Sequence, residues 1–244
     1  MSFSAPTIEI VKIDHIQIAF EPWSWEFAIT HRAEIDRHFA ALQRGRSALW
    51  NGRVLLLNRY AIRNGVLHGA CFETDYASFI AWREWNFPDH NISNVFAAAA
   101  LRAADGAYLV GEMAPYTAAA GQIYFPSGTP EPDDILTSGA LDLRANLRRE
   151  LLEETGIDID ELDVEPGWTV VIDRNFVVFV KQLTARQNAD ELRSRVMRYL
   201  ATDAQPELSG VCIVRGPAGL DTRMPPFMVA FLEEAWRRQG IAVP

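Results

Sequence analysis

Hydrophobic and polar positions along the first third of the chain follow patterns typical of both strands and helices. Residues 7–20 place isoleucines at alternate positions in two stretches, the period of a half-buried strand. Residues 26–45 carry apolar side chains at helical spacing and end at a glycine, which predicts an amphipathic helix. Residues 53–75 predict two strands joined around Arg-Asn-Gly, which is a hairpin signal. A short helix is expected at 76–85.

The remaining chain follows a stretch rich in turn-forming residues, 86–94, which is the best candidate for a boundary. We therefore predict an N-terminal α+β region over 1–92 and a second domain over 93–244. In the second domain the pattern predicts a hairpin at 95–113, strands at 121–128, 168–172, 176–183 and 210–214, and helices around 148–157, 189–201 and 228–239.

Composition narrows the classes of protein. The chain of 244 residues is 49% hydrophobic and 23% charged, which is typical of a folded globular protein. Its formal net charge of -9 disfavours nucleic acid as a partner, and any anionic substrate would need a local cation such as a bound metal.

The cysteines and the apolar runs indicate the cellular compartment in which we expect the protein. The two cysteines, Cys71 and Cys212, lie in apolar runs and are expected to be buried thiols of a reducing compartment. The longest apolar run, Val-Phe-Ala-Ala-Ala-Ala-Leu, is far shorter than the roughly 20 residues of a membrane span. We expect a cytoplasmic protein without a membrane partner, and a homodimer stays open.

The segment 148–157, Arg-Arg-Glu-Leu-Leu-Glu-Glu-Thr-Gly-Ile, holds the strongest candidate chemistry. On a helix, spacings of three and four residues put Glu150, Glu153 and Glu154 on one face, beside a stripe of leucines. Three carboxylates this close repel one another unless a cation binds, and oxygen ligands alone favour Mg²⁺ or Mn²⁺. A solvated, glutamate-rich helix end is the alternative. Gly156 is placed to end the helix with a left-handed cap.

The same segment resembles the signature box of Nudix hydrolases. The second half of that box matches at Arg149, Glu150, Leu151, Glu153, Glu154, Gly156 and Ile157. The first half departs from it, because Leu141 stands where the family has a glutamate, and the glycine that we match, Gly128, lies about seven residues too early. Residues 129–142 therefore look like an insertion, and Ser127 replaces a second glycine.

The resemblance implies a fold, a cofactor and roles for residues. The fold would be a Nudix α/β/α sandwich with a mixed sheet, preceded by the smaller α+β region. Glu150, Glu153 and Glu154 would ligate Mg²⁺ (or Mn²⁺), and Arg149 would orient one of them. Glu207, just before a strand, is the candidate for a further ligand or base. The catalytic residues would then be Glu153, Glu154, Glu207 and Arg149, with Gly128 and Gly156 as structural residues of the box.

The implied reaction is hydrolysis of a phosphoanhydride bond. Similarity of the segment 125–132 to nucleotide-sugar enzymes of the family suggests a nucleoside diphosphate linked to a sugar-like group as the small-molecule substrate. A coenzyme A pyrophosphatase is the first alternative. A non-catalytic nucleotide-binding regulatory module is the second alternative. It stays open because Leu141 replaces a glutamate of the box, a change that could have cost activity. Further phosphate contacts could come from Arg174, Arg215 or Arg223. Asp133 and Asp134 could touch the metal or the substrate, but we interpret them as residues of a solvated loop.

Overall fold

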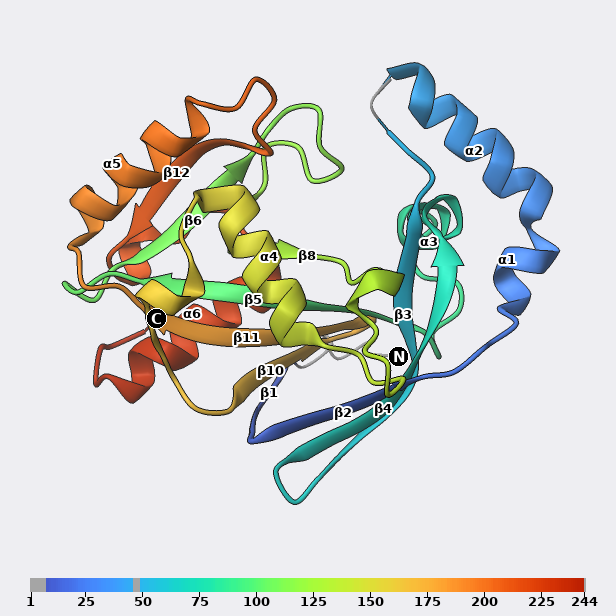
Figure 1. Cartoon of the computed structure of the whole chain (residues 1–244), viewed down its shortest axis with the longest axis horizontal. Coiled ribbons are helices and arrows are strands. Elements are labelled where there is room, and N and C mark those ends of the chain that lie inside the picture. Colours follow the sequence, from blue (N-terminus) through green and yellow to red (C-terminus); the bar gives the residue numbers. More distant parts are fainter. Residues whose placement is uncertain (1–7, 46–48, 244) are drawn as a thin grey trace, which may run out of the picture.

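One mixed sheet of twelve strands runs through the whole structure (Figure 1). The computed structural model describes residues 8–45 and 49–243. The strands are β1 (Glu9–Ile13), β2 (His15–Phe20), β3 (Arg53–Arg63), β4 (Val66–Asp75), β5 (Ser93–Arg102), β6 (Tyr108–Met113), β7 (Ile123–Tyr124), β8 (Ser127–Gly128), β9 (Asp163–Val164), β10 (Trp168–Asp173), β11 (Phe176–Thr184) and β12 (Leu208–Val214).

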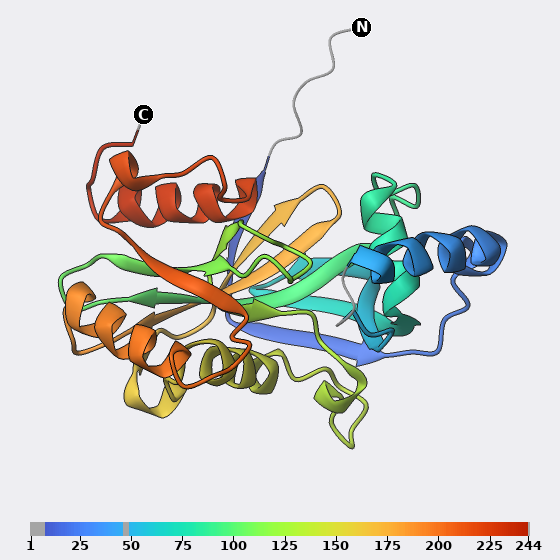
Figure 2. The ribbon, with the colours of Figure 1, turned by 90° about the horizontal axis from the view of Figure 1, so that it is seen from above.

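The helices cover both faces of this sheet. They are α1 (Glu26–Thr30), α2 (Arg32–Gly45), α3 (Tyr76–Glu84), α4 (Leu143–Thr155), α5 (Ala189–Leu200) and α6 (Pro226–Arg238). Figure 2 shows α4 and α5 on one side of the sheet and α6 on the other. Helix α3 packs on the same side as α6. Leu56, which shares a hydrophobic cluster with α3, lies opposite Asn94 in the β3–β5 pair. Phe96, two residues further along β5, therefore points to the same face, and it shares a cluster with α6. This arrangement gives three layers.

The sheet order explains how distant segments meet. The main path is β1-β10-β11-β5-β3-β4-β2, while β6 pairs with β5 and carries β12 and β7. Strands β5 and β11 run parallel, and so do β2 and β4, whereas the other pairs are antiparallel. Strand β8 pairs with the middle of β5 at Ala97 and Ala98. Strand β6 pairs with β5 only further along, at Leu101 and Arg102.

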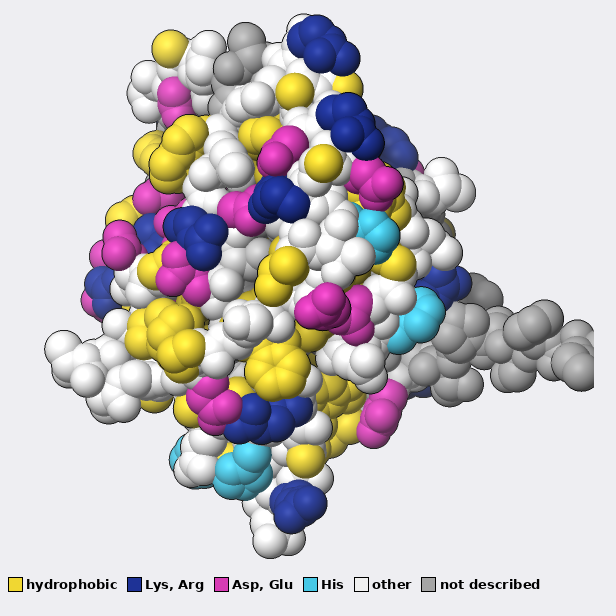
Figure 3. Space-filling model, turned by 90° about the vertical axis from the view of Figure 1, so that its right-hand side faces the viewer, with side chains coloured by type: hydrophobic (Ala, Val, Ile, Leu, Met, Phe, Trp, Pro, Cys, Tyr) yellow, Lys and Arg dark blue, Asp and Glu magenta, His cyan; other side chains and the backbone are white. Residues whose placement is uncertain are grey.

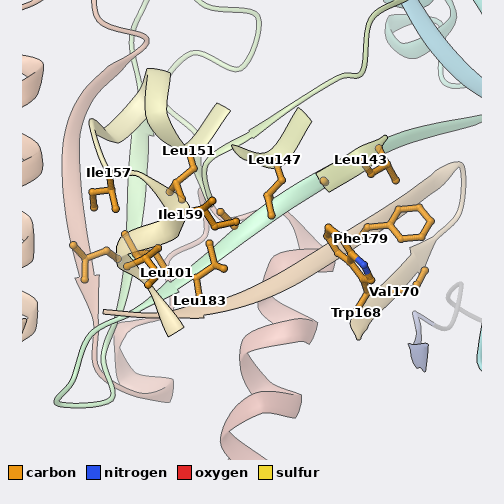
Figure 4. Close-up of a cluster of buried hydrophobic side chains, with 14 of the residues drawn as sticks. Leu101, Leu143, Leu147, Leu151, Ile157, Ile159, Trp168, Val170, Phe179 and Leu183 are labelled. Atoms are coloured by element: carbon orange, nitrogen blue, oxygen red, sulfur yellow. The ribbon is translucent and has the colours of Figure 1, made fainter. Parts of the chain in front are cut away.

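Helix α4 is anchored by the leucine stripe that its sequence predicts. Leu143, Leu147 and Leu151 are at most 2% exposed and point toward β5 and β11 (Figure 4). Burial of each such side chain contributes on the order of 2 kcal/mol, which fixes the rotation of α4 about its axis. The face bearing the glutamates is fixed with it.

Three predicted elements are interrupted. The strand expected at 7–20 breaks at Asp14, because β1 pairs with β10 and β2 with β4. The helix at 26–45 is divided at His31, and the strand at 121–128 divides into β7 and β8 around Pro126, which has no N–H for a ladder. The remaining predicted helices and strands are confirmed within a few residues.

The mixed α/β class is confirmed, but the N-terminal region does not form a separate body. Strand β3 pairs with β5, and β1 pairs with β10, so the sheet is continuous across the expected boundary at residue 92. Leu55 and Leu57 also share a hydrophobic cluster with the leucines of α4. The division into domains 1–92 and 93–244 therefore stays a prediction.

The surface and the two thiols can be compared with what the composition predicts. The face formed by the right-hand side of Figure 1 carries acidic and basic side chains interspersed (Figure 3). Both cysteines are free. Cys71 is buried, as expected, and burial raises its pKa to about 12. Cys212 is only partly buried, so the expectation of a buried thiol is wrong for that residue. None of the helices in the described ranges is long and apolar enough to cross a membrane.

Candidate active site

Helix α4 begins and ends with the caps that its sequence provides. At the start, the carboxylate of Asp142 accepts hydrogen bonds from the N–H groups of Arg144 and Ala145, both at 3.0 Å. At the end, Gly156 adopts φ of 66° and its N–H donates to the carbonyl of Leu152. A side chain at Gly156 would also meet the ring of Tyr199 at 2.4 Å. The predicted left-handed cap is confirmed.

Glu154 lies deepest of the three α4 glutamates. Glu154 is only 4% exposed, and its Oε1 accepts a hydrogen bond of 3.0 Å from the N–H of Ser127. Burial raises the pKa of Glu154 well above its ordinary value, Ser127 opposes the rise, and the charges of Glu150 and Glu207 add to it. An ionised carboxylate at this position is therefore destabilised unless positive charge reaches it.

Glu150 lies against the backbone of β8. A Cβ added at Gly128 would come within 2.1 Å of the Glu150 carboxyl carbon, so only glycine permits this approach. Although Gly128 lies too early in the sequence for the box, the structure brings it to Glu150. Burial raises the pKa of Glu150 to about 7, Arg149 opposes the rise, and Glu153 adds to it.

Arg149 is held by a buried aspartate from the inserted segment. Its Nη1 donates to Oδ1 of Asp134 at 2.6 Å, and its Nη2 donates to Oε1 of Glu150 at 3.1 Å. Asn146, which is fully buried, donates to Asp134 as well. The interpretation of Asp134 as a solvated residue is wrong, since its side chain is 2% exposed. Asp133 is exposed, as expected. The glutamate that Arg149 orients is therefore Glu150.

Glu153 and Glu207 complete the group. Glu153 is exposed on α4, and Glu207 is exposed just before β12 but lies within the walls of the cleft. Burial by those walls raises the pKa of Glu207, and the charge of Glu153 adds to the rise. The charge of Glu207 in turn acts on Glu150 and Glu154. The four glutamates that the sequence suggested thus lie within electrostatic reach of one another, three on α4 and one just before β12, more than fifty residues later.

A fifth carboxylate was not expected from the sequence. Burial raises the pKa of Glu131, Arg149 opposes the rise, and the charges of Asp134, Asp133 and Glu153 add to it. Glu131 therefore lies within electrostatic reach of the α4 carboxylates. The acidic character of the inserted segment was the available clue, but its spacing follows no helical or strand period.

The donor chemistry fits a hard divalent cation. The group contains carboxylate oxygens without histidine or cysteine, which favours Mg²⁺ or Mn²⁺ over zinc. Burial, together with mutual repulsion, raises the pKa values of Glu150, Glu154 and Glu207, and a cation would relieve both effects. Within the described ranges no three potential ligands are already close enough to form a complete metal site. Binding would therefore require side-chain rotation, for which the exposed Glu153 and Glu207 are free.

A cleft of about 450 Å³ opens beside these carboxylates. Ser127, Gly128 and Glu207 line its acidic part, and the loop after β6 closes one side. Tyr116 of that loop donates its hydroxyl hydrogen bond to the carbonyl of Pro206, which ties the loop to the segment before Glu207. The volume lies within the usual range for small-molecule sites.

The other expected phosphate contacts lie outside this cleft. Arg215 pairs with Asp105 and Asp190, and Arg223 pairs with Asp221 and Glu112. Together with Arg174, these arginines are absent from the part of the cleft wall that the described residues form.

Leu141, at the position of the missing box glutamate, is 6% exposed and packs in the α4 core. Its N–H donates to the carbonyl of Ile18, so the inserted segment docks on β2. A carboxylate there would be buried among apolar side chains, which explains physically why leucine suits this position.

Comparison with known proteins gives similarity of structure only. No family model and no curated protein matches the sequence. A Nudix hydrolase from M. smegmatis shares 15% identity over 60% of this chain and 86% of its own, with a TM-score of 0.42. The MutT protein from Methanosarcina mazei Go1 shares 20% over 60% and 95%, with a TM-score of 0.41. A Nudix hydrolase from Nitrosomonas europaea shares 15% over 61% and 74%, with a TM-score of 0.35. Each of these matches covers about 60% of this chain.

Proposed function

We propose that this protein is a Mg²⁺-dependent pyrophosphohydrolase that cleaves a nucleoside diphosphate linked to another, sugar-like group. The observation that carries the proposal is the mutual electrostatic influence of Glu150, Glu153, Glu154 and Glu207 beside a cleft of about 450 Å³ whose wall includes Glu207. Burying like charges together costs stability, and a diphosphate-bound cation is the natural compensation. The box residues support the same assignment.

The cation would be held by Glu150, Glu153 and Glu154. When bound, it would neutralise the diphosphate and make a water molecule easier to deprotonate. Glu150 is fixed for this task by Arg149, which is itself held by Asp134. Glu154 is fixed by the N–H of Ser127. As in other phosphoryl transfers, the protein then acts mainly by positioning and by charge.

Glu207 is the proton acceptor in this proposal. It lines the cleft rather than packing under α4, so it can reach a water molecule beside the substrate. Its pKa is raised toward neutral pH, which favours action as a general base. Glu153, the exposed α4 glutamate, shares the cation and is the nearest alternative base.

Two alternatives remain within the same site. Coenzyme A also contains a phosphoanhydride, and the cleft volume does not distinguish it from a nucleotide sugar. A non-catalytic nucleotide-binding module is compatible with the buried Leu141. The clustered carboxylates favour the enzyme, because nucleotide binding alone needs no such concentration of negative charge.

Product analysis tests the proposal. The protein is incubated with Mg²⁺ and nucleotide sugars, ADP-ribose, dinucleotides, coenzyme A or nucleoside triphosphates, and the products are separated by chromatography. We expect cleavage of a diphosphate-linked substrate that Glu154→Gln abolishes and Glu9→Gln, an exposed strand residue, leaves unchanged. Binding of these compounds without any cleavage would support the regulatory module instead.

A further inference from the structure

The wall of the cleft is built by both halves of the chain. Helix α3, within the N-terminal region, contributes Phe79 and Arg83, while β11 and α6 contribute Phe176 and Phe227. The rings of Phe176 and Phe227 lie 6.2 Å apart, tilted by 31°. An apolar wall of this kind suits a planar aromatic group, because offset stacking on such rings is favourable.

A buried amide faces the same cleft. Asn94 of β5 is 4% exposed and lines the cavity, and its Oδ1 has no hydrogen-bond partner among the described residues. Leaving a buried acceptor unpaired costs roughly 1–3 kcal/mol, so unpaired groups in native structures call for an explanation. A ligand N–H directed at Oδ1 would remove this cost.

Arg83 supplies a second polar group. It is the one lysine or arginine among the described residues that line the cleft, and it forms no ion pair within the described ranges. Its guanidinium lies 5.6 Å from the centre of the Phe79 ring. Because Arg83 lines the cleft, its guanidinium N–H groups can donate to a ligand that carries carbonyl or ring-nitrogen acceptors.

We propose that Asn94, Arg83 and the surrounding rings bind the nucleobase of the substrate, which makes the N-terminal region the specificity element of the enzyme. Asn94 accepts from an N–H of the base, Arg83 donates to an acceptor of the base, and the aromatic side chains hold its plane. The proposal rests on the proposed function for the presence of a nucleotide, but it concerns binding and not hydrolysis. It also gives α3 a role that the sequence did not reveal.

Equilibrium binding of nucleoside 5′-monophosphates tests this assignment. These probes carry a base but no phosphoanhydride, so calorimetry with AMP, GMP, CMP and UMP in the presence of EDTA reports on the base site alone. We expect at least one monophosphate to bind more tightly than ribose 5-phosphate. Arg83→Ala and Asn94→Leu should each raise its Kd by about tenfold or more.

Two controls make the result decisive. Arg37→Ala, an exposed arginine of α2, should leave the Kd unchanged. Asn94→Leu should leave the Tm of the ligand-free protein unchanged or higher, because it removes the unpaired acceptor. A large fall in Tm would show that Asn94 serves the fold, and the proposal would then be overturned for that residue.

The outcomes also separate this proposal from the proposed function. Base binding that depends on Arg83 and Asn94, without hydrolysis of any diphosphate, would retain the base site and reject the pyrophosphohydrolase. Hydrolysis that proceeds normally in Arg83→Ala and Asn94→Leu, with unchanged KM, would reject the base site. Equal binding of ribose 5-phosphate and all four monophosphates would reject it as well.

Discussion

Glu154 shows how a single buried carboxylate links stability to metal binding. Its burial and its like-charged neighbours oppose ionisation, while Ser127 is the backbone donor that steadies it. Glu154→Gln keeps the shape and the hydrogen bond but removes the charge. We therefore expect the metal-free variant to be as stable as the parent or more so. The variant should also lose the rise in Tm that Mg²⁺ or Mn²⁺ gives to the parent.

Thermal unfolding with and without Mn²⁺ measures this expectation. Glu9→Gln, with the same chemical change at an exposed position, should behave like the parent. An unchanged metal response in Glu154→Gln, or no response in the parent, would show that the α4 carboxylates do not hold the ion.

Glu150 predicts a pH dependence with a definite sign. Its pKa of about 7 in the folded protein exceeds the ordinary value of 4.5, so the folded state binds this proton more tightly than the unfolded state. Stability of the metal-free protein should therefore fall as pH rises between about 4.5 and about 7, by up to about 3 kcal/mol. Glu154 contributes in the same direction.

Urea denaturation at about pH 5 and about pH 8 measures this slope. The Glu150→Gln variant should show a flatter dependence, and added Mg²⁺ should stabilise the parent more at the higher pH, where the carboxylates are ionised. A metal-free protein that gains stability steadily between these pH values would refute the assignment.

Asp134 predicts a positioning effect on catalysis. Asp134→Asn would leave Arg149 with a weaker partner and loosen Glu150, at a cost of about 2 kcal/mol in stability given that Arg149 is partly exposed. The kcat of the proposed hydrolysis should fall about tenfold or more, with little change in KM, since Asp134 does not line the cleft. Asp133→Asn, at the exposed neighbouring position, is the matched control. Equal kcat values for the two variants would contradict the role.

Single residues also mark where prediction from sequence ends. The α4 glutamates were predictable because helical spacing and the box agree. Asp134 was not, because its contact with Arg149 spans an inserted segment of no regular period. Asn94 carried a weak signal, a lone amide entering an apolar strand, but it lines a cleft only because α3, β11 and α6 contribute side chains to the same cavity.

Strand β8 shows what the short elements contribute. At Gly128 the strand backbone comes so close to Glu150 that an added Cβ would lie 2.1 Å from its carboxyl carbon. Gly128→Ala should displace that carboxylate, lower stability by about 1–3 kcal/mol and weaken metal binding about tenfold. Gly210→Ala is the control, because an added Cβ there meets nothing within 4 Å. Thermal unfolding and a Mn²⁺ titration compare the two variants, and equal behaviour would show that Glu150 adapts to the methyl group.

Long elements were predictable because local patterns decide them, whereas short ones depend on distant neighbours. The leucine stripe and the caps of α4 lie within the helix itself. Strands β7 and β8 have two residues each, and they exist because β6 and β5 lie beside them. The break at Asp14 likewise follows from the separate partners of β1 and β2.

The whole molecule depends on pairing between its two halves. Strand β1 covers the outer edge of β10, and β3 pairs with β5 at Leu56 and Leu57. A fragment of residues 93–244 would expose those edges and the apolar side chains that β3 covers. We therefore expect this fragment to aggregate or to lose fixed tertiary structure, even though the box and Glu207 lie within it.

Expression of the fragment alone and together with residues 1–92 tests this dependence. Near-UV circular dichroism and amide exchange should show native packing only when both parts are present, because the sheet is then complete. A fragment that folds cooperatively and still binds Mn²⁺ would instead support residue 92 as the boundary between independent domains. In that case α3 would add side chains to a cleft that residues 93–244 form without it. Removing residues 1–92 should then weaken base binding and leave metal binding unchanged.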